Sequence, residues 1–102
     1  MQFQLVLQFN GDSLSDYDAM VTLEDELIQE LGDTADVDGH DIGAGQTNIF
    51  IVTSQPEITF RRAKAVLERS QLLGAVTAAY RPVAGQSFTV LWPAHRLGFS
   101  VA

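Results

Sequence analysis

Apolar and polar side chains alternate along the first residues of the chain. This period of two over residues 3–9 predicts a β-strand that buries one of its faces. Apolar residues then recur every three or four positions as far as Gly32, a pattern that predicts an amphipathic helix over residues 16–31. The apolar side chains of this helix are Met20, Leu23, Leu27, Ile28 and Leu31.

The middle of the chain predicts a hairpin of two strands within residues 36–52. Glycines at positions 43 and 45 supply the turn, and the alternating apolar run of residues 48–52, which begins with Asn48, follows it. A second helix is predicted over residues 56–72, with Pro56 in the first turn, where its missing N–H does no harm. The last two strands are predicted over residues 76–81 and 88–92, separated by a turn-forming loop.

The order of these elements, β-α-β-β-α-β-β, predicts one α+β domain over residues 1–102. The chain has 102 residues, 46% of them apolar, which suits a single core. The natural closure is a ferredoxin-like β-α-β-β-α-β fold with an additional C-terminal strand, in which an antiparallel sheet carries both helices on one face. The tail, residues 93–102, lacks periodicity, and Leu97 and Phe99 can dock it on the surface.

Charge is distributed very unevenly along the chain, which has a formal net charge of -7. Residues 1–60 contain twelve acids and no lysine or arginine, whereas residues 61–102 contain all six basic residues and one acid. This acidity argues against nucleic-acid binding, which needs clustered basic side chains. The asymmetry indicates either an acidic helix lying against a basic one or an acidic surface offered to a basic partner.

Several classes of protein are excluded because the sequence lacks the residues that they need. Without cysteine there is no disulfide, thiolate metal site or cysteine nucleophile. No apolar run approaches the roughly 20 residues that a membrane-spanning helix needs, and the first residues do not resemble a secretory signal. We therefore expect a cytoplasmic protein that has no cofactor and does not bind membranes.

The densest polar cluster lies in the first strand of the predicted hairpin. Because Asp36, Asp38 and His40 alternate, we expect their side chains on one face, where they could hold a divalent cation. His40 could instead act as a base oriented by Asp38 or Asp41. An EF-hand calcium loop does not fit, because Thr47 occupies the position of its required glutamate. The alternative is a solvated strand whose charges prevent edge-to-edge pairing.

A second candidate group lies on the last two strands. Tyr80, Arg81 and Trp92 would form a pocket wall together with His40 if the sheet face opposite the helices were free. The alternative for the two aromatic side chains is a place in the core or in a dimer interface. Asn48 heads a buried strand and is expected to form hydrogen bonds across the glycine turn.

Three segments of the sequence resemble a group of small bacterial proteins. They are the DGHD-x-G-x-G-x-x-NIFI pattern at residues 38–51, the tripeptide at residues 79–81 and the pentapeptide TVLWP at residues 89–93. The resemblance implies a stand-alone bacterial domain of ferredoxin-like fold. It transfers no activity, because none is known to us for the group.

These observations favour a non-catalytic binding or interaction domain. Its partner-facing surface would be the acidic first helix together with residues 36–41, and a basic protein is the electrostatic match. A homodimer through the uncovered sheet face or an edge strand is also expected. The alternative is a small hydrolase or lyase that uses Asp38, His40 and Asp41, with or without a metal.

Overall fold

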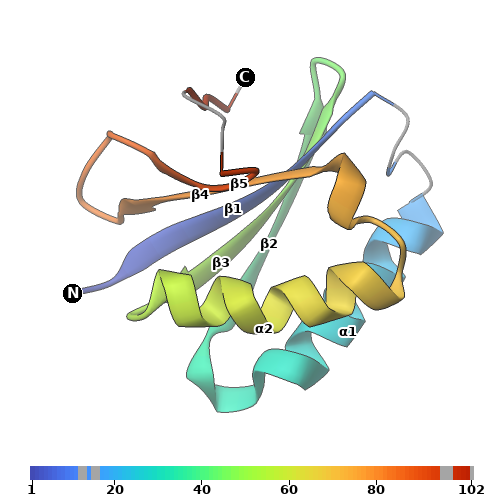
Figure 1. Ribbon diagram of the computed structural model, residues 1–102, viewed down its shortest axis with the longest axis horizontal. Helices are drawn as coiled ribbons and strands as arrows, with labels where there is room; N and C mark the ends of the chain where they lie inside the picture. Colours follow the sequence, from blue (N-terminus) through green and yellow to red (C-terminus); the bar gives the residue numbers. More distant parts are fainter. Residues whose placement is uncertain (12–13, 15–16, 95–97, 102) are drawn as a thin grey trace.

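The computed structural model describes residues 1–11, 14, 17–94 and 98–101, and this part of the chain forms an α+β fold. A five-stranded antiparallel sheet has the order β2-β3-β1-β4-β5, and two helices pack on one of its faces (Figure 1). The elements are β1 (Phe3–Asn10), α1 (Tyr17–Leu31), β2 (Asp36–Gly43), β3 (Gln46–Thr53), α2 (Pro56–Arg69), β4 (Val76–Pro82) and β5 (Thr89–Trp92). The predicted α+β class and the predicted order of elements are confirmed, and the arrangement is compatible with a ferredoxin-like fold.

The core lies between the sheet and the helices, as the alternation along β1 predicts. Leu5, Leu7 and Phe9 of this central strand are completely buried in the cluster that the helices cover. The helices contribute their apolar stripes to the same cluster. These stripes consist of Met20, Leu23, Leu27 and Leu31 from α1 and Phe60, Ala63, Val66 and Leu67 from α2.

The second helix ends earlier than predicted. It stops at Arg69, and the N–H groups of Gln71 and Leu72 donate to the carbonyl oxygens of Glu68 and Leu67. This pair of bonds forms a Schellman motif, which requires a left-handed residue just past the helix. Gln71 takes that role with φ of 59°. Glycine is the usual residue there, so the sequence pattern placed the helix end at Gly74 instead.

The two helices meet through opposite charges, as the distribution of charge along the chain predicts. Arg62 of α2 donates to the backbone carbonyl of Glu30 on α1, and its guanidinium lies 3.9 Å from the Glu30 carboxylate. Arg69 lies 3.7 Å from the same carboxylate, and the Ser70 hydroxyl donates to Glu26 at 3.3 Å. Two cations of the basic helix therefore pair with Glu30 on the α2 side of α1.

The sheet face opposite the helices, here called the far face, is partly covered by the C-terminal tail (Figure 1). Gln8 is 1% exposed, and its amide donates to Asn48 at 3.0 Å and to the Ser100 carbonyl at 2.9 Å. The rings of Phe99 and Phe88 pack against each other, with their centroids 4.9 Å apart. Phe99 therefore docks the tail as predicted, while Leu97 lies outside the described residues.

In the part of the chain that the structure describes, neither helix has the length and apolar character needed to cross a membrane.

Candidate functional site

Strand β2 forms one edge of the sheet, and a bulge interrupts its pairing with β3. Val37 lies opposite Ile51 and His40 lies opposite Ile49, so three steps along β2 match two steps along β3. The extra residue is accommodated by Gly39, whose φ of 110° is rarely adopted by other residues.

The bulge separates the polar cluster that the alternating sequence predicts. Directly opposed residues of an antiparallel pair share a face of the sheet. Asp36 and Asp41 lie opposite Val52 and Asn48 and so belong to the far face, whereas His40 lies on the helix face opposite Ile49. The prediction that Asp36, Asp38 and His40 share one face is wrong, because it assumed an unbroken period of two.

His40 contacts α1 instead of its acidic neighbours on β2. Its Nδ1 lies 3.3 Å from the Glu24 carboxylate, and its ring packs edge-on against Tyr17 with centroids 6.1 Å apart. Among the described residues, no group of three histidine or acidic side chains is arranged to hold a metal ion. The cluster expected for a cation or for base catalysis is therefore not assembled.

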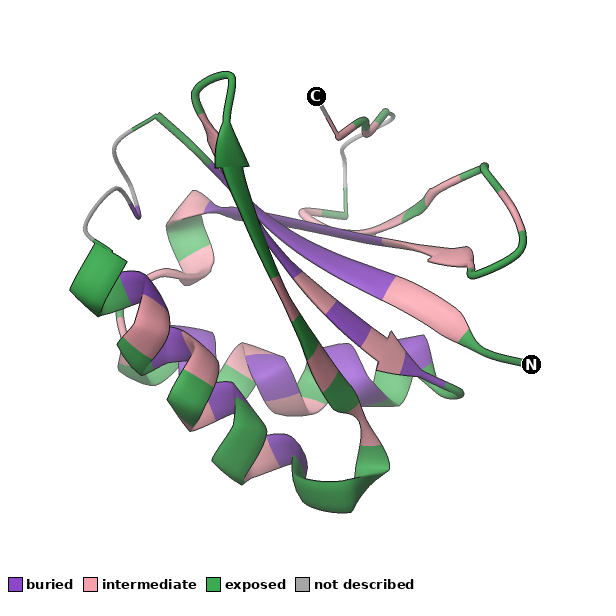
Figure 2. Cartoon of the chain, turned by 180° about the vertical axis from the view of Figure 1, so that it is seen from behind, coloured by how far each residue is buried: buried purple, intermediate pink, exposed green. Residues whose placement is uncertain are grey.

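The acids of β2 nevertheless form an exposed edge. Asp36, Asp38 and Asp41 are all exposed, and none of them forms an ion pair with another residue in the described ranges. Figure 2 shows β2 running along the rim of the sheet, mostly in the colour of exposed residues. We call these three carboxylates the acidic edge.

Large apolar side chains are exposed next to the acidic edge. Tyr17 and Ile28 on α1 are 60% and 51% exposed, and Ile42 on β2 is 53% exposed. Tyr17 packs on His40, which lies two residues before Ile42, and Ile28 is one helical turn beyond Glu24. The side of the molecule where α1 meets β2 is thus both acidic and partly apolar.

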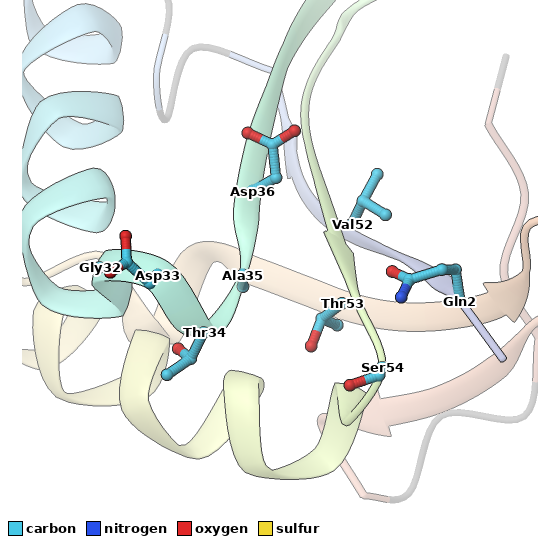
Figure 3. Close-up of a pocket in the computed structure, with 9 residues that line it drawn as sticks. All are labelled: Gln2, Gly32, Asp33, Thr34, Ala35, Asp36, Val52, Thr53 and Ser54. Atoms are coloured by element: carbon cyan, nitrogen blue, oxygen red, sulfur yellow. The ribbon is translucent and has the colours of Figure 1, made fainter.

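A hollow of about 580 Å³ lies where β2 begins and β3 ends. Figure 3 shows Asp36 and Val52 on neighbouring strands, with Asp33 and Thr34 from the preceding 3-10 turn and Gln2 and Ser54 farther along. Its side chains are neutral or acidic, so the hollow extends the acidic character of the β2 edge.

Asn48 and the side chains of the last hairpin are not gathered into one site. Asn48 is 2% exposed and accepts a hydrogen bond from Gln8 on the neighbouring strand β1. Tyr80 packs edge-on against Phe3 on the helix side, with centroids 5.6 Å apart. Trp92 donates to the Leu73 carbonyl at 3.2 Å.

Arg81 lies on the other face from both aromatic residues. It opposes Gln4 across the β1–β4 pair, which puts it on the far face, while Tyr80 opposes the core residue Leu5. The predicted pocket wall of Tyr80, Arg81, Trp92 and His40 is therefore wrong. The two aromatic side chains instead pack beside the core, as the alternative prediction states.

Sequence reasoning missed a hollow on the far face. Phe50, Phe88 and Phe99 line it together with Arg81. The available signal was Phe50, an aromatic residue that lies with Asn48 and Val52 on the face of its strand opposite the core residues Ile49 and Ile51. The tail contact that completes the hollow has no periodic signature.

Comparisons of this chain with protein-family models, with curated proteins and with solved structures found no match.

Proposed function

We propose that this protein is a non-catalytic binding domain whose acidic edge receives a basic polypeptide. The observation that carries the proposal is the set of three exposed carboxylates, Asp36, Asp38 and Asp41, on a strand at the rim of the sheet. None of them has an ion-pair partner among residues 1–11, 14, 17–94 and 98–101. Complementary charge steers association and selects the partner.

The internal pairing of charges supports this proposal. Arg62 and Arg69 pair with Glu30 on the opposite side of α1 from β2, and Lys64 lies 4.5 Å above the Trp92 ring. None of these basic side chains of α2 forms an ion pair with the three carboxylates of β2. A basic partner would supply the cations that these three carboxylates lack among the described residues.

The position of β2 suggests how a partner would bind. An edge strand can add an extended segment through its backbone, while side-chain contacts give specificity. The bulge leaves the stretch from His40 to Gly43 in regular register, and Ile42 offers apolar contact within it. We infer an extended segment in which lysine or arginine alternates with apolar residues.

A second copy of this chain is a poor partner for the same edge. Pairing two β2 strands would bring together the three carboxylates of each copy, and like charges on an edge strand oppose such pairing. We therefore assign the edge to a basic partner, and a homodimer would have to use another surface.

The fold proposed for this domain is ferredoxin-like with β5 added. In its support, β3 lies between β1 and β2, and β1 lies between β3 and β4, so both helical connections span a split pair of strands. The strand order β2-β3-β1-β4 then forms the unit, and β5 extends it at the edge opposite β2.

Binding can be tested by fluorescence anisotropy with a labelled decapeptide of alternating lysine and valine. We expect saturable binding by the native protein and loss of most affinity in the triple variant Asp36→Asn, Asp38→Asn, Asp41→Asn. The matched control removes the same charge elsewhere, through Asp25→Asn, Glu57→Gln and Glu68→Gln, which are exposed and unpaired among the described residues. Equal weakening by both triple variants would mean attraction to net charge alone and would refute the assignment.

A further inference from the structure

The far face carries a hollow whose side chains differ in character from the acidic edge. Its volume is about 490 Å³, within the usual range of small-molecule sites. It is built by three strands, the β4–β5 loop and the tail. The side chains that define its chemistry are Gln4, Phe50, Arg81, Gln86, Phe88 and Phe99.

Arg81 is held in place by the β4–β5 loop. Its Nη1 donates to the carbonyl oxygens of Pro82, Val83 and Gly85 at 3.1, 3.0 and 2.9 Å. Its Cζ lies 6.0 Å from the centre of the Phe88 ring. A guanidinium with one nitrogen anchored to the backbone is already oriented, so less conformational entropy is lost when a ligand binds its other nitrogens.

Arg81 has no acidic partner among the described residues, although the chain contains thirteen acids. Its neighbours in the hollow are aromatic rings, amides and a hydroxyl, none of which neutralises its charge. A partly buried guanidinium that is anchored but not neutralised favours an oxyanion, which it can bind through two parallel hydrogen bonds.

The rest of the hollow indicates what the anion would carry. Phe88 and Phe99 pack against each other with centroids 4.9 Å apart, and Phe50 projects from the neighbouring part of the sheet. These rings offer a surface for a flat or aliphatic body, while the amides of Gln4 and Gln86 can orient polar substituents. Inorganic phosphate would leave the aromatic surface unused.

We propose that this hollow binds a small organic carboxylate with an aromatic or aliphatic body. Arg81 takes the carboxylate, and Phe50, Phe88 and Phe99 contact the body. The site is separate from the acidic edge, because its lining residues lie on β1, β3, β4, the β4–β5 loop and the tail and include none from β2.

The test is a titration followed by two-dimensional amide NMR, with 2-naphthoate, 4-phenylbutyrate and octanoate as probes. We expect saturable shifts at Gln4, Phe50, Arg81 and Phe88 with at least one probe. 2-Naphthamide, which has the same ring system without the charge, and inorganic phosphate should both bind more weakly. Absence of saturable shifts at the hollow with all three carboxylates up to about 10 mM, enough to detect millimolar affinity, would overturn the proposal.

Variants separate a specific site from general attraction. Arg81→Gln should weaken binding about tenfold or more, because it removes a charged hydrogen-bonding partner. Arg81→Lys retains the charge but not the two parallel donors, and it should rescue only part of the affinity. The matched control is Arg61→Gln, an exposed cation on α2 on the helix side of the sheet, and it should bind like the native protein.

Because Arg81 also anchors the β4–β5 loop, replacing it could change the shape of the hollow. A second variant is therefore needed that leaves the loop unchanged. Phe50→Leu keeps an apolar side chain of similar size and leaves the hydrogen bonds of Arg81 intact. It should weaken 2-naphthoate more than octanoate, because only the former stacks on a ring. Unchanged binding in both Arg81→Gln and Phe50→Leu would exclude this hollow as the site.

Discussion

Arg62 on α2 donates hydrogen bonds to the backbone carbonyl of Glu30, in the last turn of α1, and to the Thr34 hydroxyl at 3.0 Å. The last carbonyl groups of a helix lack partners within the helix and carry partial negative charge. The final turn of α1 contains no basic residue of its own. The second helix therefore supplies the C-terminal cation that the first helix lacks.

This relationship predicts that Arg62→Gln is destabilising. The substitution removes a charged donor from a partly buried carbonyl, which should lower the free energy of unfolding by about 1–3 kcal/mol. Urea unfolding followed by circular dichroism would measure the change. Arg69→Gln is the control, because its pair with Glu30 is more exposed and should contribute no more than about 1 kcal/mol. An equal loss in both variants would show that attraction to the Glu30 carboxylate, not the capping of α1, is what matters.

The bulge in β2 predicts a specific effect at Gly39. Gly39→Ala should destabilise the protein by about 1–3 kcal/mol, because φ of 110° is unfavourable for a residue with a Cβ. Steric contact is not the cause, since a Cβ at this position would meet no atom within 4 Å.

Gly43→Ala provides the matched control on the same strand. A Cβ there also meets no atom within 4 Å, and Gly43 does not have positive φ. Chemical denaturation should show little change for this variant. If Gly39→Ala proved equally neutral, the bulge would not be a fixed feature of β2.

The end of α2 predicts a stabilising substitution. Gln71 adopts φ of 59°, a conformation that costs a residue with a Cβ about 1 kcal/mol relative to glycine. Gln71→Gly should therefore raise the thermal unfolding midpoint, although the greater freedom of glycine in the unfolded chain offsets part of the gain. Ser70→Gly, one residue earlier at φ of -88°, should not be stabilising. A fall in the midpoint for Gln71→Gly would contradict the Schellman geometry.

The sequence predicts those parts of the fold that periodicity encodes. The alternation along β1 predicts one buried face, and so does the helical spacing of Met20, Leu23 and Leu27. The structure buries both of these faces. The unequal charge of the two halves predicts the contact between the helices, because oppositely charged side chains on adjacent helices attract at short range.

Departures from periodicity explain what the sequence does not predict. A single bulge turns His40 to the opposite face from that expected, and Gly39 alone does not distinguish a bulge from an ordinary strand residue. On β4, Tyr80 and Arg81 are neighbours in the chain and therefore point to opposite faces of the strand, which the predicted pocket wall did not take into account. The far-face hollow depends on a long-range contact of the tail, which no local pattern records. The bacterial resemblance and the cytoplasmic location stay predictions.

If β2 receives a basic segment, amide NMR of the native protein will locate the contact directly on this strand. The alternating lysine and valine decapeptide would be titrated at low and at physiological ionic strength. We expect saturable shifts concentrated at residues 36–43, with smaller shifts along α1, and weaker binding as salt screens the charges. Shifts spread over the whole acidic surface, or centred on α2 and β5, would contradict it.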